Sequence, residues 1–154
     1  MFGLIAISSR LVRCAFPAVR TVRFSCDAHD KSQPTENELS DAQYERLSTE
    51  TLDKFAEVFD MLGEQYDLGD AYDVLHDYGV LKVEFGSPVG TYIINRQAPN
   101  KQLWLSSPLS GPKRYDFLIN KGKWIYKHDG TALHNLLNKE ISDIVGHSVE
   151  FPEK

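Results

Sequence analysis

The first regular pattern of apolar residues along the chain predicts an amphipathic helix that begins near Ser40. Apolar or near-apolar residues recur every three or four positions, as one face of a helix requires: Tyr44, Leu47, Thr51, Leu52, Phe55, Val58, Phe59 and Leu62. Ser40 and Gln43 have the spacing of a capping box, in which each side chain satisfies a backbone N–H group. Gly63 follows the last apolar position, and we expect the helix to end or fray there.

Short alternating segments come next, and they predict antiparallel strands joined by tight turns. The predicted strands are two within residues 72–85, then 91–97, 102–107, 113–118 and 123–127. A second helix is predicted over 131–145, because leucine and isoleucine recur there at helical spacing and Gly146 follows. This order predicts an α+β fold, in which two terminal helices pack on one face of an antiparallel sheet of about six strands.

The alternation of side chains predicts what the uncovered face of that sheet presents. If Leu103 and Leu105 point to the core, Trp104 points to the open face. Its expected neighbours there are polar: Asn95, Gln97, Gln102 and Ser106. A tryptophan among polar groups on an open sheet is a candidate interaction site. The alternative places Trp104 in the core, but it would bury those polar groups without evident partners.

Length and composition are those of one globular domain, since 154 residues include 42% hydrophobic and 25% charged ones. No uncharged apolar stretch reaches the roughly 18 residues of a membrane span. The net charge of −5 hides an asymmetry. Residues 1–26 carry four arginines and no acid, whereas residues 36–77 carry 13 acids against two bases. Nucleic-acid binding is disfavoured, because the chain after the leader is anionic.

The apolar, arginine-bearing leader predicts a mitochondrial transit peptide over residues 1–26, cleaved near Phe24 or Ser25. A secretory signal would concentrate its charge before an unbroken apolar core, and a simple N-terminal arm is the remaining alternative. We expect residues 27–39 to be a flexible polar arm, residues 40–146 the folded domain and residues 147–154 a short tail.

The first predicted helix carries a row of carboxylates opposite its apolar face. Its members are Glu50, Asp53, Glu57, Asp60 and Glu64. Like charges at this spacing destabilise a helix by about 0.2–0.5 kcal/mol per pair. Three interpretations remain open: a solvated face, a weak site for hard cations, which prefer oxygen ligands, or a docking face for a basic partner.

One long block of residues resembles the signature of the frataxin family. It reads NRQAPNKQLWLSSP over residues 95–108 and continues as SGPKRYD over residues 110–116. Residues 44–47, 51–53, 90–92, 128–130 and 133–134 also resemble frataxins, so that the resemblance covers about residues 40–145. It implies the frataxin-like α–β sandwich and a place in the mitochondrial matrix.

The resemblance also implies a role in iron–sulfur cluster assembly, with a cysteine desulfurase and its scaffold protein as partners. The implied partner-binding residues are Asn95, Gln97, Gln102, Trp104 and Arg114. Iron, as Fe(II) or Fe(III), is implied to bind weakly through surface carboxylates. These are Glu45, Glu50, Asp53, Glu57, Asp60, Glu64 and Asp73.

Two functions follow as hypotheses. In the first, the protein is a non-catalytic effector that accelerates sulfur transfer to the scaffold. In the second, it is a ferroxidase or iron chaperone that oxidises Fe(II) and stores or delivers it, ferrochelatase and haem synthesis included. We expect a monomer, with an iron-induced oligomer as the alternative. The inward-facing Glu-x-x-His pairs of a closed di-iron site are not found in the sequence, which favours the effector.

Overall fold

The computed structural model describes residues 39–152. The predicted transit peptide and the predicted arm up to residue 38 lie outside the described residues. The elements along the chain are α1 (Asp41–Gln65), β1 (Asp73–Asp77), β2 (Val80–Glu84), β3 (Thr91–Gln97), η1 (Ala98–Asn100), β4 (Gln102–Ser107), β5 (Gly111–Leu118), β6 (Lys123–Tyr126) and α2 (Leu133–Val145).

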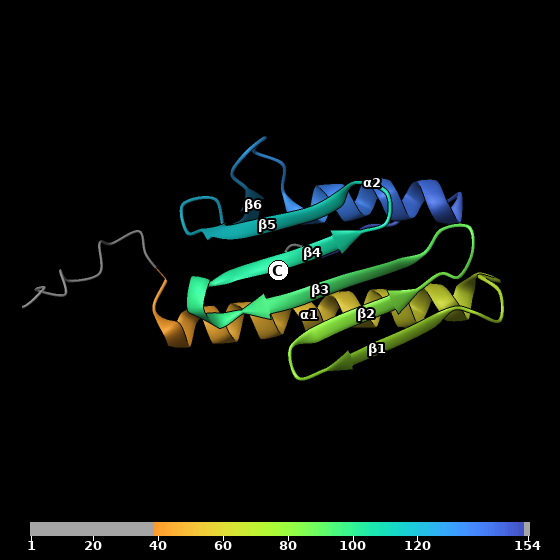
Figure 1. Cartoon of the computed structure of the whole chain (residues 1–154), viewed down its shortest axis with the longest axis horizontal. Helices are drawn as coiled ribbons and strands as arrows, with labels where there is room; N and C mark the ends of the chain where they lie inside the picture. The colour runs from red at the N-terminus through yellow and green to blue at the C-terminus, as the bar shows by residue number, and fades with distance from the viewer. Residues whose placement is uncertain (1–38, 153–154) are drawn as a thin grey trace, which may run out of the picture. The chain divides into compact units, whose positions relative to one another are not determined.

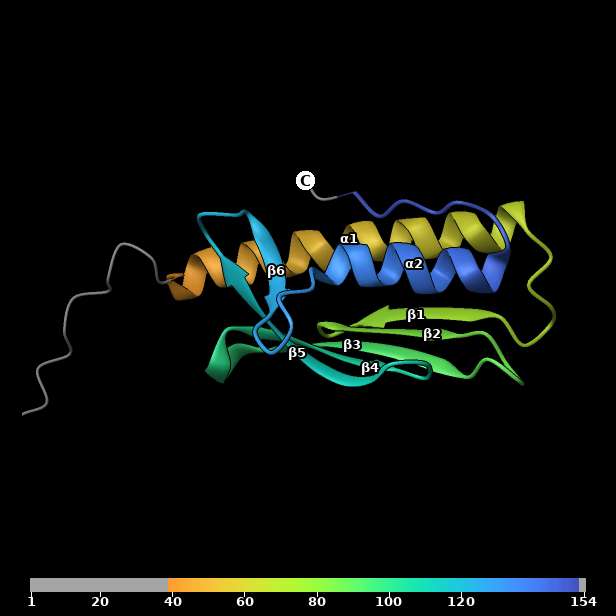
Figure 2. The same ribbon diagram turned by 90° about the horizontal axis from the view of Figure 1, so that it is seen from above.

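The six strands form one antiparallel sheet in chain order, β1 to β6, and both helices cover the same face of it. Figure 1 looks onto the sheet, with the helices behind it, and Figure 2 shows the helices and the sheet as two layers. The α+β fold and its layer arrangement are therefore confirmed. Neither helix within residues 39–152 is long and apolar enough to cross a membrane.

Helix α1 begins as the capping box predicts. The Gln43 backbone N–H donates to Ser40 Oγ over 3.2 Å, and the Ser40 backbone N–H donates to Gln43 Oε1 over 2.9 Å. Leu39, at the last position of the expected arm, is 7% exposed and belongs to the same core as Tyr44 of α1. An apolar residue just before the cap commonly packs against the first helical turn in this way.

The prediction that α1 ends at Gly63 is wrong, because the helix continues to Gln65. A close contact explains this glycine: a Cβ there would lie 2.8 Å from Cε1 of the Tyr72 ring. The Tyr72 hydroxyl donates to the Phe59 carbonyl over 2.6 Å, which holds the ring against the helix. Gly63 therefore makes room for a side chain and does not terminate the helix.

The C-terminal segment packs on the helices. Phe151 is 3% exposed, and its ring lies 5.2 Å from that of Phe55 and 5.0 Å from that of Phe59. Its backbone N–H donates to Asn138 Oδ1 over 2.8 Å, and the Val149 N–H donates to Ser142 Oγ over 2.8 Å. The tail thereby covers apolar surface that the helices alone would leave in water.

Candidate functional site

The five predicted partner-binding residues lie together on the open face of the sheet. The register pairs Asn95 with Trp104 and Trp104 with Arg114, and the next row pairs Gln97 with Gln102. Leu103 and Leu105, on the other face of β4, are buried, so the predicted alternation is confirmed. Strands β3, β4 and β5 face the viewer in Figure 1. We call this group of five residues the Trp104 surface.

Contacts within the Trp104 surface fix the indole in one orientation. Trp104 Nε1–H donates to Gln102 Oε1 over 3.0 Å, and Gln102 Nε2 donates in turn to Asp116 Oδ1 over 3.1 Å. The Arg114 guanidinium lies 4.5 Å from the centre of the Trp104 ring, a cation–π geometry. A side chain held this way loses little conformational freedom when a partner covers it.

A cationic hollow of about 460 Å³ adjoins the Trp104 surface. Its lining includes Lys113, Arg114, Lys127 and His128, and Asp116 is ion-paired to Lys127 over 3.2 Å. Asp116 was not predicted as a site residue. The signal for it was available, because the hairpin register that pairs Trp104 with Arg114 also pairs Gln102 with Asp116.

The carboxylates of α1 form an exposed acidic face. The five that share it are Glu50, Asp53, Glu57, Asp60 and Glu64. Two are paired: Glu50 lies 3.6 Å from Arg46, and Asp53 lies 3.6 Å from His76 Nδ1. Within residues 39–152 no three His, Cys, Asp or Glu side chains gather as a metal site would require. A cation on this face would keep most of its water.

Two other predicted iron ligands lie apart from this row. Glu45 forms an ion pair with Arg96, whose Nη1 also donates to Thr49 Oγ1 over 2.8 Å. The negative charge of Glu45 is thus already neutralised by Arg96. In the register of β1 and β2, Asp73 lies opposite Glu84, and Glu84 is the chain neighbour of the buried Val83. By alternation Asp73 faces the open side of the sheet, away from the helices. The structure therefore does not bring all seven carboxylates together.

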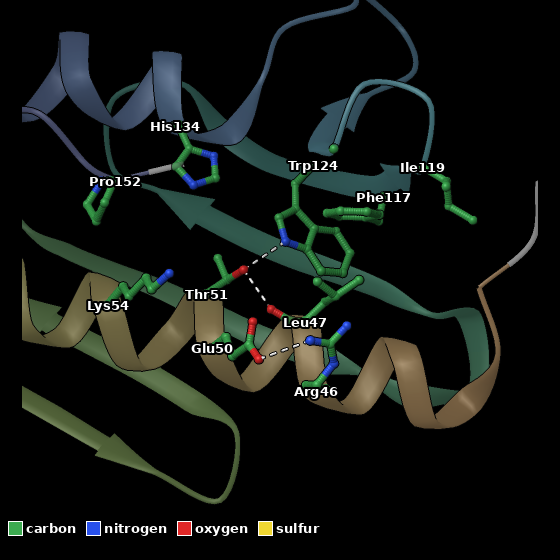
Figure 3. A pocket seen from close by; sticks show the side chains of 11 residues that line it. Arg46, Leu47, Glu50, Thr51, Lys54, Phe117, Ile119, Trp124, His134 and Pro152 are labelled. Atoms are coloured by element: carbon green, nitrogen blue, oxygen red, sulfur yellow. Dashed lines mark hydrogen bonds and ion pairs between the residues drawn. The ribbon is translucent and has the colours of Figure 1, made fainter. Parts of the chain in front are cut away.

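A second cavity, of about 410 Å³, lies between α1, β6 and the start of α2 (Figure 3). Trp124 Nε1–H donates to Thr51 Oγ1 over 3.0 Å, and Thr51 Oγ1–H donates to the Leu47 carbonyl over 2.7 Å. His134 is 3% exposed and meets the Phe55 ring edge-on at 5.0 Å, so it packs in the core. This cavity is on the helix side of the sheet.

A buried carboxylate supports the end of β4 behind the Trp104 surface. Glu140 Oε2 accepts hydrogen bonds from Tyr92 Oη over 2.9 Å and from Ser107 Oγ over 2.6 Å. Ser107 Oγ in turn accepts from the backbone N–H groups of Leu109 and Ser110. Burial, and then the bond to Glu140, raise the pKa of Tyr92 well above its usual value. The network fixes the β4–β5 turn to α2.

The fold and the site define a small α–β sandwich with a polar, tryptophan-centred sheet face and an acidic helix. The family model of the frataxin-like domain matches residues 37–147. The mitochondrial frataxin homolog of Drosophila melanogaster is 43% identical over 156 residues, which cover 95% of this chain and 82% of the relative. Mitochondrial frataxin of Caenorhabditis elegans is 48% identical over 107 residues, which cover 70% and 78%.

Solved structures agree with this match. A trimeric frataxin of the yeast Saccharomyces cerevisiae, complexed with ferrous iron, superposes with a TM-score of 0.57 at 35% identity, covering 74% of this chain and 93% of that one. Frataxin of Psychromonas ingrahamii gives a TM-score of 0.58 at 27% identity, covering 74% and 99%. The chain belongs to the frataxin family. Since its relatives are mitochondrial frataxins, it is a mitochondrial protein.

Proposed function

We propose that this protein is a matrix effector of iron–sulfur cluster assembly. It docks through the Trp104 surface on the complex of a cysteine desulfurase with its scaffold protein, and it accelerates sulfur transfer to the scaffold. In this proposal the chemistry belongs to the desulfurase. The effector acts by stabilising the arrangement of the complex in which the persulfide reaches its acceptor.

The observation that carries the proposal is the fixed orientation of Trp104. An indole on an open sheet face, hydrogen-bonded to Gln102 and stacked under Arg114, is costly to expose without a partner. Tryptophan and arginine are the residue types most enriched among those that dominate binding energy at protein interfaces. Their placement side by side supports a docking role for the whole Trp104 surface.

Iron enters the proposal as a weakly bound cargo. The open carboxylates of α1 offer one or two oxygen ligands each, which suits a hydrated Fe(II) ion. The yeast frataxin complexed with ferrous iron supports iron binding in this chain as well. The acidic face also attracts a basic partner surface and speeds the encounter with it.

The second candidate function is that of a ferroxidase or iron chaperone. It is favoured by the same ferrous yeast complex, which is trimeric, and by the row of carboxylates on α1. In this alternative the protein oxidises Fe(II) with O₂, assembles with iron, and supplies it for clusters or, through ferrochelatase, for haem. The scattered carboxylates make the alternative less favoured than the effector.

Sulfide release by a purified desulfurase–scaffold complex at fixed Fe(II) separates the two functions. The wild-type protein is expected to raise the rate several-fold, and Trp104→Ala to abolish that rise. Leu109→Ala, which truncates an exposed side chain on the β4–β5 turn, is the matched control and should act as the wild type does.

A second variant carries Asp53→Asn, Glu57→Gln, Asp60→Asn and Glu64→Gln together. We expect it to lose iron binding while it still docks. No stimulation by the wild type, together with O₂-dependent Fe(II) oxidation that this variant loses, would instead establish the ferroxidase alternative.

A further inference from the structure

The turn between β1 and β2 presents an aromatic side chain to solvent in an unusual backbone conformation. Tyr78 is 95% exposed, the most exposed large hydrophobic side chain within residues 39–152, and its φ is +46°. Asp77 pairs with Val80 in the ladder, so Tyr78 and Gly79 form a two-residue hairpin turn. Both turn residues have positive φ, a conformation that favours Asn, Asp or Gly. A tyrosine there serves neither the turn nor the core.

The turn is held rigidly in place. The Tyr78 backbone N–H donates to Asp77 Oδ1 over 2.9 Å, and the Arg96 backbone N–H donates to the Gly79 carbonyl over 2.9 Å. The Arg96 side chain packs so closely that a Cβ on Gly79 would lie 2.3 Å from its Nε. Arg96 is anchored on α1 by its ion pair with Glu45. The backbone that carries the Tyr78 side chain is therefore held in one position.

A hollow of about 310 Å³ lies beside the turn. It lies on the helix side of the sheet, because its lining includes Asp53 of α1 and the side chains of His76 and Arg96, together with Asp77 and Tyr78. Arg96 is paired with Glu45, and Asp53 lies 3.6 Å from His76 Nδ1, so Asp77 is the acidic group that these two pairs leave to the hollow. A guanidinium or ammonium group fits the combination, since it can pair with a carboxylate while lying on the face of the aromatic ring.

The turn lies at the edge of the sheet, with the hollow on the helix side of it and the Trp104 surface on the open side. One row of the ladder runs from Asp77 through Val80 and Asn95 to Trp104. Neighbouring strands are about 4.8 Å apart, so Trp104 on β4 lies only roughly 14 Å across the sheet from β1. Figure 1 shows the β1–β2 turn at the same end of the sheet as the starts of β4 and η1. A protein of ordinary interface size reaches both features at once.

We propose that Tyr78 is a second anchor of the docking interface, and that it receives a lysine or arginine side chain of the desulfurase–scaffold complex. The cation stacks on the phenol ring and pairs with Asp77. This inference rests on the proposed effector function and adds to it a contact on the edge of the sheet, with a stated chemistry for the partner group.

The test is the affinity of the desulfurase–scaffold complex for single variants of the full chain, measured by titration calorimetry. Tyr78→Asn removes the ring but creates an Asn-Gly turn, which the backbone favours. We expect the dissociation constant to rise roughly five- to tenfold, as loss of an aromatic anchor does, while the Tm is unchanged or higher. If Tyr78 served only the fold, the substitution would leave the dissociation constant unchanged and would lower Tm.

Three further variants sharpen the result. Tyr78→Phe keeps the ring and should bind within about twofold of the wild type. Asp77→Asn keeps the Oδ1 acceptor for the turn but removes a charge, so it should weaken binding at low salt and much less at high salt. Ile119→Ala, on the exposed β5–β6 turn, is the matched control and should leave affinity unchanged.

Wild-type affinity of Tyr78→Asn, with Trp104→Ala still defective, would overturn this inference and leave the proposed function standing. No binding of the wild type to the complex would overturn both. Equal losses in Tyr78→Phe and Tyr78→Asn would overturn the stacking contact, because the ring would then contribute nothing.

Discussion

The acidic face of α1 should lower the stability of the folded protein, and Asp60→Asn tests this directly. Asp60 is exposed, and Glu57 and Glu64 lie three residues before it and four residues after it on the same helix. Each such like-charge pair destabilises by about 0.2–0.5 kcal/mol. Removing two pairs should therefore raise the free energy of unfolding by roughly 0.4–1 kcal/mol. For a domain of this size that is about 2–4 °C in Tm.

The assay is thermal unfolding followed by circular dichroism at low salt and again at about 1 M salt, where screening extends over only about 3 Å. The gain should shrink at high salt. Asp41→Asn makes the same chemical change in the first turn of α1, where a negative charge is favourable. Asp41 also lies 3.1 Å from Lys101. That control should lower Tm, so the two substitutions are expected to change Tm in opposite directions.

An unchanged or lower Tm for Asp60→Asn would contradict this reasoning, because it would mean that the carboxylates do not repel one another appreciably. A gain that persists at high salt would point to helix propensity instead of charge. The expected outcome means that the acidic face is kept at the expense of stability, as a binding surface would be.

Three other changes probe the core. Glu140→Gln should lower the free energy of unfolding by about 1.5–3 kcal/mol in urea titration, because it removes the charge of a buried carboxylate that accepts from two hydroxyl groups. A smaller change would mean that these hydrogen bonds do not stabilise the fold appreciably. The buried hydroxyl of Tyr115 has no hydrogen-bond partner among residues 39–152, and burial raises its pKa above the usual 10.0. That hydroxyl must stay protonated in the fold, so its contribution to the free energy of unfolding is intact below pH 10 and is lost as the pH rises further. Tyr115→Phe should be neutral or stabilising at pH 7 and should reduce the loss of stability at alkaline pH. An unchanged dependence of stability on pH would contradict this. Gly63→Ala should lower Tm despite the roughly 1 kcal/mol helix preference for alanine, because its Cβ would meet the Tyr72 ring, whereas a higher Tm would show that the ring moves aside easily.

Much of the fold could be predicted because it is encoded locally. The apolar alternation about Leu103 and Leu105 set the face of Trp104. Turn residues marked where the hairpins lie, although β5 begins at Gly111, two residues before its predicted start. The end of α1 could not be predicted, because the role of Gly63 depends on Tyr72, which approaches from beyond the helix. The ion pair of Glu45, an iron ligand implied by the family resemblance, could not be predicted for a similar reason. Nothing near it in sequence shows that Arg96, 51 residues later, pairs with it.

We propose that the open sheet face, and not the acidic helix alone, meets the desulfurase–scaffold complex. The most direct measurement places a photo-crosslinking residue at Ser106, which is exposed on β4 between Ile93 and Pro112, and a second at Met61 on α1. We predict that Ser106 crosslinks to a subunit of the complex and that the crosslink disappears with Trp104→Ala. Crosslinking from Met61 but not from Ser106 would contradict the account.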